Sequence, residues 1–123
     1  MKKSKKTKWL RIPEEHDYPA AASYLNLIFD KAITDEMIVS LKNTNVQNYK
    51  AKDLFRASSL SLLGISNSHV EKDLQKIKSK KKLSPLLLIR NTKNSKLIIA
   101  DGYHRLCAVY ALNEDALIPC KII

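Results

Sequence analysis

The stretch IIADGYHRLCAVYAL, residues 98–112, holds the residue types best suited to chemistry, because an apolar run stops at a glycine and two potential cations follow. Glycine has no Cβ, so Gly102 permits a positive φ and the close approach of a ligand. A helix starting directly after it would direct unpaired backbone N–H groups into the same space. Positive charges on His104 and Arg105 would lie at the positive end of the helix dipole, which is unfavourable for the helix. A bound anion would compensate for this repulsion.

The chemistry that fits this joint is phosphate binding. Arg105 can hold two phosphate oxygens at once, His104 can donate or exchange a proton, and Tyr103 belongs to the same binding group. Asp101 and His104 are the candidate catalytic residues, and Asp101 would act as a base or hold the Mg²⁺ of a nucleoside triphosphate. The alternative is a structural strand–turn–helix joint in which Arg105 pairs with Asp101 or another acidic neighbour.

A second group of potential cations lies in SNSHVEKDLQKIKS, residues 66–79, which begins with capping side chains and is predicted to be a helix starting at Ser66 or Ser68. Helical spacing brings His69, Lys72 and Lys76 to one side, so this helix can present three potential cations together. An ordinary solvated lysine face is the alternative. The apolar positions expected to face the core are Val70, Leu74 and Ile77.

Two further segments carry candidate residues. In KAKDLFRASSL, residues 50–60, Arg56 is expected to reach a phosphate, while Asp53 would hold a metal, orient Arg56 or form a structural ion pair, which we favour. The acidic group at residues 14–17, EEHD, would supply a base or a magnesium ligand, although capping of the following helix is the commoner role.

The net charge of +10 is concentrated in two lysine clusters. These clusters hold ten of the 22 Lys and Arg residues. The remaining twelve basic residues are balanced by twelve Asp and Glu residues. One cluster comprises Lys2, Lys3, Lys5, Lys6 and Lys8, and the other Lys76, Lys78, Lys80, Lys81 and Lys82. Lysine runs bind phosphate backbones without reading sequence, so Lys78, Lys80, Lys81 and Lys82 are candidate contacts to DNA or RNA. For the first eight residues a solubilising terminus is the alternative.

The pattern along the chain predicts an α+β fold, a small mixed β-sheet with packed helices. Helices are expected from Tyr18-Pro19 with Asp17 as the cap, and from a Thr34 cap with Met37, Ile38 and Leu41 facing the core. The sequence NTNVQN, residues 43–48, reads as a loop, and residues 49–65 as a short helix or irregular structure. A hairpin of strands 85–90 and 96–100, a helix over 103–112 and a strand over 117–123 complete the fold.

Length and composition predict a basic tail at residues 1–12 and a single domain at 13–123. The sequence contains neither a membrane span nor the apolar region of a secretory signal, so we expect a cytoplasmic protein without a membrane partner. Cys107 and Cys120 lie in apolar surroundings and are expected to be core thiols rather than disulfide or zinc ligands. Trp9 is expected to anchor the N-terminal segment to the core, with stacking on a base as the alternative.

The segment from His69 to Ile123 resembles the ParB/sulfiredoxin superfamily. ADGYHRLCAVYALNEDALIPCKII is similar to that family's box of glycine, His and Arg followed by a small-residue helix and an Ile-Pro strand, and LSPLLLIR resembles the strand before it. The resemblance implies that Gly102, His104 and Arg105 hold nucleotide phosphates. It also implies that the preceding helix faces the nucleotide with His69, Lys72 and Lys76. WLRIPEEHDYPAAASYL and AKDLFRASSL look like segments of short, uncharacterised bacterial ParB-like proteins.

Departures from the family limit this expectation. Sulfiredoxins carry their catalytic cysteine where this chain has Tyr103, so sulfinic acid repair is not expected. The sequence ends where partition proteins continue into a helix-turn-helix, so a complete partition protein is not expected either. We therefore expect binding of a nucleoside triphosphate such as ATP or CTP, with Mg²⁺ and with hydrolysis or phosphoryl transfer left open. The alternatives are a DNA- or RNA-binding module or nuclease using the same pocket, and a small-molecule kinase.

Overall fold

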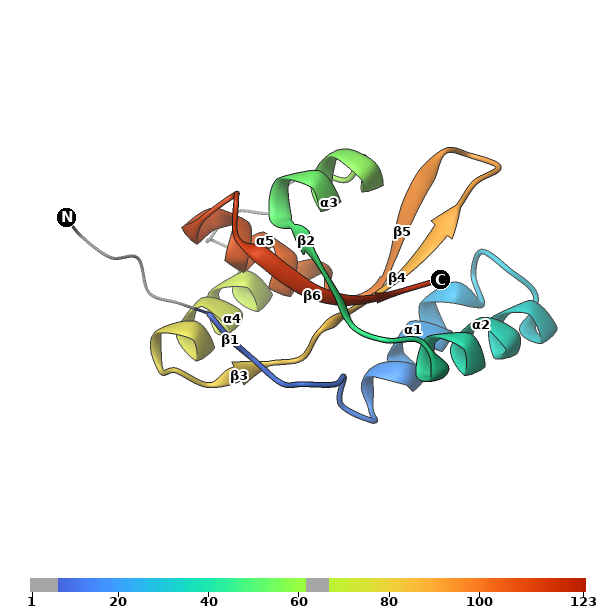
Figure 1. Ribbon diagram of the computed structural model, residues 1–123, viewed down its shortest axis with the longest axis horizontal. Coiled ribbons are helices and arrows are strands. Elements are labelled where there is room, and N and C mark those ends of the chain that lie inside the picture. Colours follow the sequence, from blue (N-terminus) through green and yellow to red (C-terminus); the bar gives the residue numbers. More distant parts are fainter. Residues whose placement is uncertain (1–6, 62–66) are drawn as a thin grey trace.

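The computed structural model describes residues 7–61 and 67–123. In these residues five helices surround a four-stranded mixed sheet and a two-stranded parallel sheet (Figure 1). The helices are α1 (Asp17–Leu25), α2 (Lys31–Asn43), α3 (Ala51–Ser58), α4 (Ser68–Lys78) and α5 (Tyr103–Leu112). The strands are β1 (Lys8–Trp9), β2 (Gln47–Lys50), β3 (Lys82–Leu83), β4 (Leu86–Asn91), β5 (Lys96–Asp101) and β6 (Leu117–Ile122). The predicted α+β class is confirmed.

The larger sheet has the strand order β2-β6-β4-β5. Strands β4 and β5 form the predicted antiparallel hairpin, with Leu88 opposite Ile99. After α5 the chain returns as β6, which runs parallel to β4 and places Cys120 opposite Leu86. Strand β2 pairs antiparallel with the outer edge of β6. The joint between β5 and α5 therefore stands at one edge of the sheet, because β5 is an edge strand.

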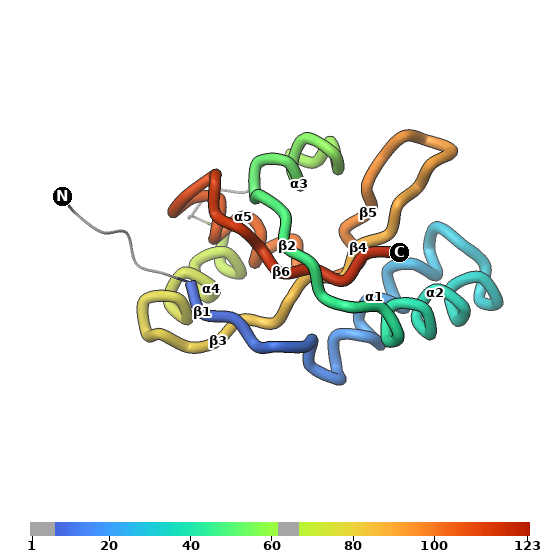
Figure 2. The backbone as a smooth tube through the Cα atoms, viewed as in Figure 1, coloured from blue at the N-terminus to red at the C-terminus, as the bar shows by residue number. Residues whose placement is uncertain are grey.

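The sheet is covered on both faces, which explains why residues 86–89 of β4 are all apolar rather than alternating with polar ones. Leu86 and Leu88 enter a cluster with α3, α4 and α5, whereas Leu87 and Ile89 enter a second cluster with α1 and α2. Figure 2 shows α1 and α2 side by side, away from α3. The predicted core residues of α4 are confirmed as buried: Val70, Leu74 and Ile77.

Two predicted helix starts are wrong. Helix α1 begins at Asp17, whose buried carboxylate accepts a hydrogen bond from Ser84 Oγ instead of capping the helix. Helix α2 begins at Lys31, where Asp30 is the N-cap and accepts from the Ile33 N–H at 3.0 Å. Thr34 is therefore a buried residue inside the first turns. The predicted core face of α2 holds, because Met37, Ile38 and Leu41 all pack in the second cluster.

Polar residues 47–50 form strand β2. The predicted loop over residues 43–48 therefore extends too far, because residues 47 and 48 belong to this strand. The ambiguous segment after it contains helix α3. Strand β1 pairs in parallel with β3, and the half-buried Trp9 packs on the core, as expected for an anchor. Residues 8 and 9 thus belong to the folded part although they fall in the range predicted as a tail.

Some sequence predictions lie outside the described residues. These are the roles of Lys2, Lys3, Lys5 and Lys6 and the conformation of residues 62–66. Both cysteines are fully buried, as predicted for core thiols, and burial raises the pKa of Cys120 to about 12. In the described ranges, no helix has both the length and the apolar character needed to cross a bilayer.

Candidate functional site

Gly102 links β5 to α5 in a conformation that requires glycine. Its φ is +105°, and a Cβ added there would lie 2.6 Å from Leu86 Cγ and 2.9 Å from the Arg105 Nη2 atom. The first hydrogen bond of α5 is donated by the Leu106 N–H to the Gly102 carbonyl at 2.9 Å. The turn is therefore tightly packed on its inner side, and the helix begins within one residue of the end of the strand, as predicted.

A polar pocket of about 210 Å³ opens on the other side of this turn. One wall is α4, and the other is the turn with the first residues of α5. The lining residues are His69, Lys72, Asp73, Lys76, Asp101, Gly102, Tyr103, His104 and Arg105. The structure thus brings together two groups that sequence reasoning had connected only by resemblance: the cationic side of α4 and the glycine-led joint.

Two imidazoles of the pocket lining contact each other directly. The ring centroids of His69 and His104 are 4.7 Å apart, with a tilt of 37° between the planes. Burial, together with the neighbouring charge of His69, lowers the pKa of His104 below its ordinary value of 6.5, and Asp73 opposes this shift only in part. His104 is therefore neutral at pH 7 and has one nitrogen able to donate and one able to accept.

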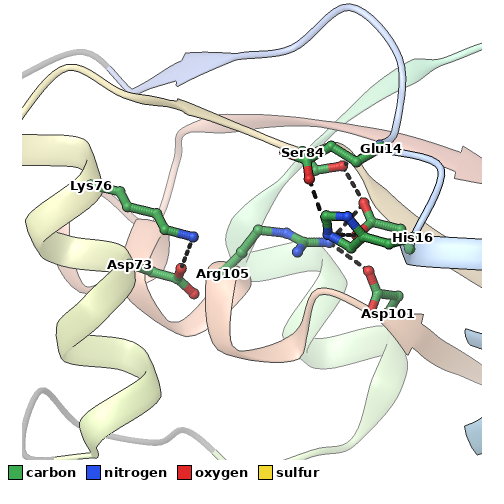
Figure 3. A network of polar contacts seen from close by, with 8 residues as sticks. Glu14, His16, Asp73, Lys76, Ser84, Asp101 and Arg105 are labelled. Atoms are coloured by element: carbon green, nitrogen blue, oxygen red, sulfur yellow. Dashed lines mark hydrogen bonds and ion pairs between the residues drawn. The ribbon is translucent and has the colours of Figure 1, made fainter. Parts of the chain in front are cut away.

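Asp73 is the pocket residue that sequence reasoning missed. It is only 8% exposed, and its carboxylate lies 3.9 Å from Lys76 Nζ (Figure 3). Burial raises the pKa of Asp73, while the positive charges of Lys76 and Arg105 oppose the shift. The signal was its spacing, because residue 73 stands one helical turn from both His69 and Lys76.

Arg105 points inward from the turn toward the N-terminal segment (Figure 3). Its guanidinium lies 2.9 Å from the Asp101 carboxylate and 4.0 Å from that of Asp17, and its side chain is only 18% exposed. The structural alternative, an Arg105–Asp101 pair, is therefore present. Two carboxylates already engage this cation, so Arg105 holds the turn in place instead of offering an open phosphate grip.

The acidic group at residues 14–17 completes this inner network. The Glu14 N–H donates to Ser84 Oγ at 3.1 Å, and Ser84 Oγ donates to Asp17. His16 Nε2 lies 3.0 Å from Glu14 and 3.3 Å from Asp17. These contacts tie the segment before α1 to the Gly102 turn through Arg105, and no side chain of this group caps α1. Glu14, His16 and Asp17 each also offer one potential metal-ligand atom, and these atoms lie within 4.8 Å of one another, the arrangement that the metal role considered from the sequence requires.

Asp101 was predicted to act as a base or magnesium ligand, and it faces Arg105. Burial raises the pKa of Asp101, whereas the charge of Arg105 and its hydrogen bond act in the opposite direction. Because the guanidinium occupies its Oδ2 at 2.9 Å, Asp101 has less capacity for a metal than Asp73 does. Of the two carboxylates lining the pocket, Asp73 is thus the better placed to meet a cation entering with a ligand.

Two larger hollows adjoin the pocket, because they share lining residues with it. One, of about 530 Å³, shares residues 101–104 and adds Tyr24, Leu60, Ser61, Ile99 and Ala100. The other, of about 440 Å³, shares Lys72 and Lys76 and adds Glu71, Gln75, Ser79 and Lys81. The polar pocket therefore adjoins a partly apolar hollow and a lysine-lined hollow, and the three together are called the trough below.

The remaining predicted residues lie apart from the pocket. Arg56 is exposed on α3 and lies 3.3 Å from Asp53, the structural ion pair favoured above for Asp53, and Arg56 is not among the pocket's lining residues. Of the four lysines predicted to contact nucleic acid, Lys81 lines the lysine-lined hollow of the trough. Lys78 is exposed at the end of α4, Lys80 is exposed shortly after it, and Lys82 is exposed in β3.

Fold and site together define a small α+β domain with a basic, histidine-bearing pocket at a glycine-led helix start. No family model matches the chain, and neither does any curated protein or solved structure.

Proposed function

We propose that the protein binds a nucleotide in the trough, with the phosphates in the polar pocket between α4 and α5. One observation carries the proposal: His69, Lys72 and Lys76 of α4 face the Gly102 turn and the start of α5 across a cavity of about 210 Å³. Lysine and histidine donors and a helix amino end are all complementary to phosphate oxygens.

The charge of the pocket supports an anionic ligand. Lys72, Lys76 and Arg105 face Asp73 and Asp101, so the lining carries a net charge of +1 while both imidazoles are neutral. A proton taken up by His104 adds one positive charge. A bound phosphate would raise the pKa of His104, so affinity should increase as the pH falls from about 7.5 to about 5.5.

The adjoining hollow at Tyr24 and Tyr103 supports a nucleotide rather than inorganic phosphate. Its lining includes two aromatic rings together with Leu60 and Ile99, which suits the flat apolar face of a base. It shares Gly102 and His104 with the phosphate pocket, so one ligand can occupy both. Where Mg²⁺ accompanies the nucleotide, Asp73 is the carboxylate that the pocket offers to it.

Calorimetric titration of ATP and CTP with Mg²⁺ tests the proposal. Lys72→Ala should weaken binding about tenfold, as expected for loss of one charge-assisted contact. Lys93→Ala, which removes the same charge from the exposed hairpin turn, is the matched control and should bind like the wild type. Equal affinity in all three proteins would refute the site. Phosphate release measured in the same mixtures reports whether hydrolysis follows binding.

Nucleic-acid binding is the second candidate, and the lysine-lined hollow of the trough favours it. Lys81 lines a hollow that also contains Lys72 and Lys76, so a phosphate backbone could follow α4 past the pocket. If the protein binds nucleic acid here, its affinity for a single-stranded oligonucleotide should fall steeply as the salt concentration rises. In Lys81→Ala this dependence of affinity on salt should be weaker. Tight nucleotide binding without this salt-dependent affinity would favour the first candidate.

A further inference from the structure

A separate cavity of about 380 Å³ lies between α3 and the β4–β5 hairpin, two elements that stand next to each other in Figure 1. It shares no lining residue with the three hollows of the trough. One wall comes from α3 through Asp53, Leu54 and Ala57. The proposed nucleotide site therefore leaves this cavity without a role.

The cavity has an apolar interior because the sheet face continues past the part that α3 covers. Leu97 of β5 and Ile122 of β6 belong to the face that carries the first cluster, and Tyr49 of β2 packs at its side. Leu54 closes the interior from α3. Leaving such a surface exposed to water is unfavourable in proportion to its area, so an apolar group that fills it would be stabilised.

Two cations stand at the hairpin end of the cavity. Arg90 and Lys96 line it and are exposed, and among the described residues no ion pair involves either of them. The acidic lining residue Asp53 already lies 3.3 Å from Arg56. The open charge of the cavity is therefore positive and is located at one end of an apolar interior.

From this arrangement we propose that the cavity binds a small amphipathic anion, with an apolar body in the interior and a carboxylate or sulfonate at Arg90 and Lys96. Arginine can bind such a group with two hydrogen bonds, and Thr92 and Ser95 add polar groups at the same end. The volume of about 380 Å³ lies in the range of small-molecule sites. The proposal is independent of nucleotide binding because the two sites have no residue in common.

Fluorescence titration with anilinonaphthalene sulfonate, an aromatic sulfonate dye, tests the site in the folded protein. We expect saturable, one-to-one enhancement of its emission. Decanoate should displace the dye, and decanol, which has the same chain length but no charge, should do so at least about tenfold more weakly. Absence of saturable dye binding would overturn the site, and equal displacement by decanol would overturn the assigned ligand class.

Three variants locate the binding. Ala57→Trp places a large side chain over the cavity from an exposed helix position and should abolish dye binding. Arg90→Gln should weaken dye binding about tenfold while leaving displacement by decanol unchanged. Arg11→Gln, which removes the same charge at an exposed position outside the cavity, is the control. Undiminished dye binding in both Ala57→Trp and Arg90→Gln, with near-ultraviolet circular dichroism confirming their fold, would refute the proposal.

Discussion

Replacing Gly102 with alanine should destabilise the protein for two separable reasons. The residue has a φ of +105°, and forcing an L side chain into the left-handed region costs about 1–2 kcal/mol. The new Cβ would also lie 2.6 Å from Cγ of the buried Leu86, and such overpacking costs about 1–3 kcal/mol. The free energy of unfolding should therefore fall by about 2–5 kcal/mol, a large part of the stability of a small domain.

A double-mutant cycle with Leu86→Ala separates the two contributions. Shortening Leu86 removes the nearest atom of the clash but leaves the backbone conformation unchanged. Urea unfolding of the wild type, both single variants and the double variant gives the cost of Gly102→Ala in each background. That cost should drop to about 1–2 kcal/mol when residue 86 is alanine, because the other close atom, Arg105 Nη2 at 2.9 Å, ends a flexible side chain that can shift at little cost, which leaves the conformational share.

Two results would contradict this reasoning. A cost below about 0.5 kcal/mol in the wild-type background would mean that the turn readily adopts another conformation. The same cost in both backgrounds would mean that Leu86 is not the obstacle. The circular dichroism of each variant at low urea serves as the control for an intact fold.

Three other changes test the electrostatics of the interior. Burial raises the pKa of Asp73, so the folded state holds this proton more tightly than the unfolded state, and the resulting stability is lost as pH rises above 3.8 through the raised value. Urea titrations should therefore find Asp73→Asn less sensitive to pH and more stable at neutral pH, and a loss of stability there would contradict this. Asp101→Ala removes the 2.9 Å hydrogen-bond partner of Arg105, whose side chain is only 18% exposed, and should lower the unfolding free energy by about 2 kcal/mol, measured by thermal melting. Because burial raises the pKa of Cys120 to about 12, a disulfide reagent should label this thiol only after unfolding, and rapid labelling of the native protein would refute its burial.

The sequence was sufficient to predict the elements whose pattern is local. Helix α5 begins and ends where its apolar spacing and Gly102 indicate, and the β4–β5 hairpin follows from two apolar runs around a turn. Strand β2 was missed because its residues, Gln47–Lys50, are polar and become a strand only by pairing with β6. The start of α2 was missed because Asp30 and Thr34 are both good caps, and packing of Thr34 decided between them.

The sequence predicted which residues line the candidate site, but not which of them are open to a ligand and which stabilise the turn. Spacing alone placed His69, Lys72 and Lys76 on one side of a helix, and they do line one pocket. The nearer partner of Arg105, Asp101, is local and was the alternative named from the sequence, whereas the second carboxylate, Asp17, reaches the turn only because the segment before α1 folds against it. No local pattern contains that contact, so a sequence cannot tell an arginine that binds a ligand from one that stabilises a turn.

Strand β4 has a consequence for how the molecule comes apart. Its consecutive side chains enter opposite clusters, so neither cluster can open without exposing one side of the same strand. Helices α1 and α2 are far in sequence from α4 and α5, yet both pairs depend on this shared central strand. Amide hydrogens on the two sides should therefore exchange together, in a single cooperative opening of the whole domain.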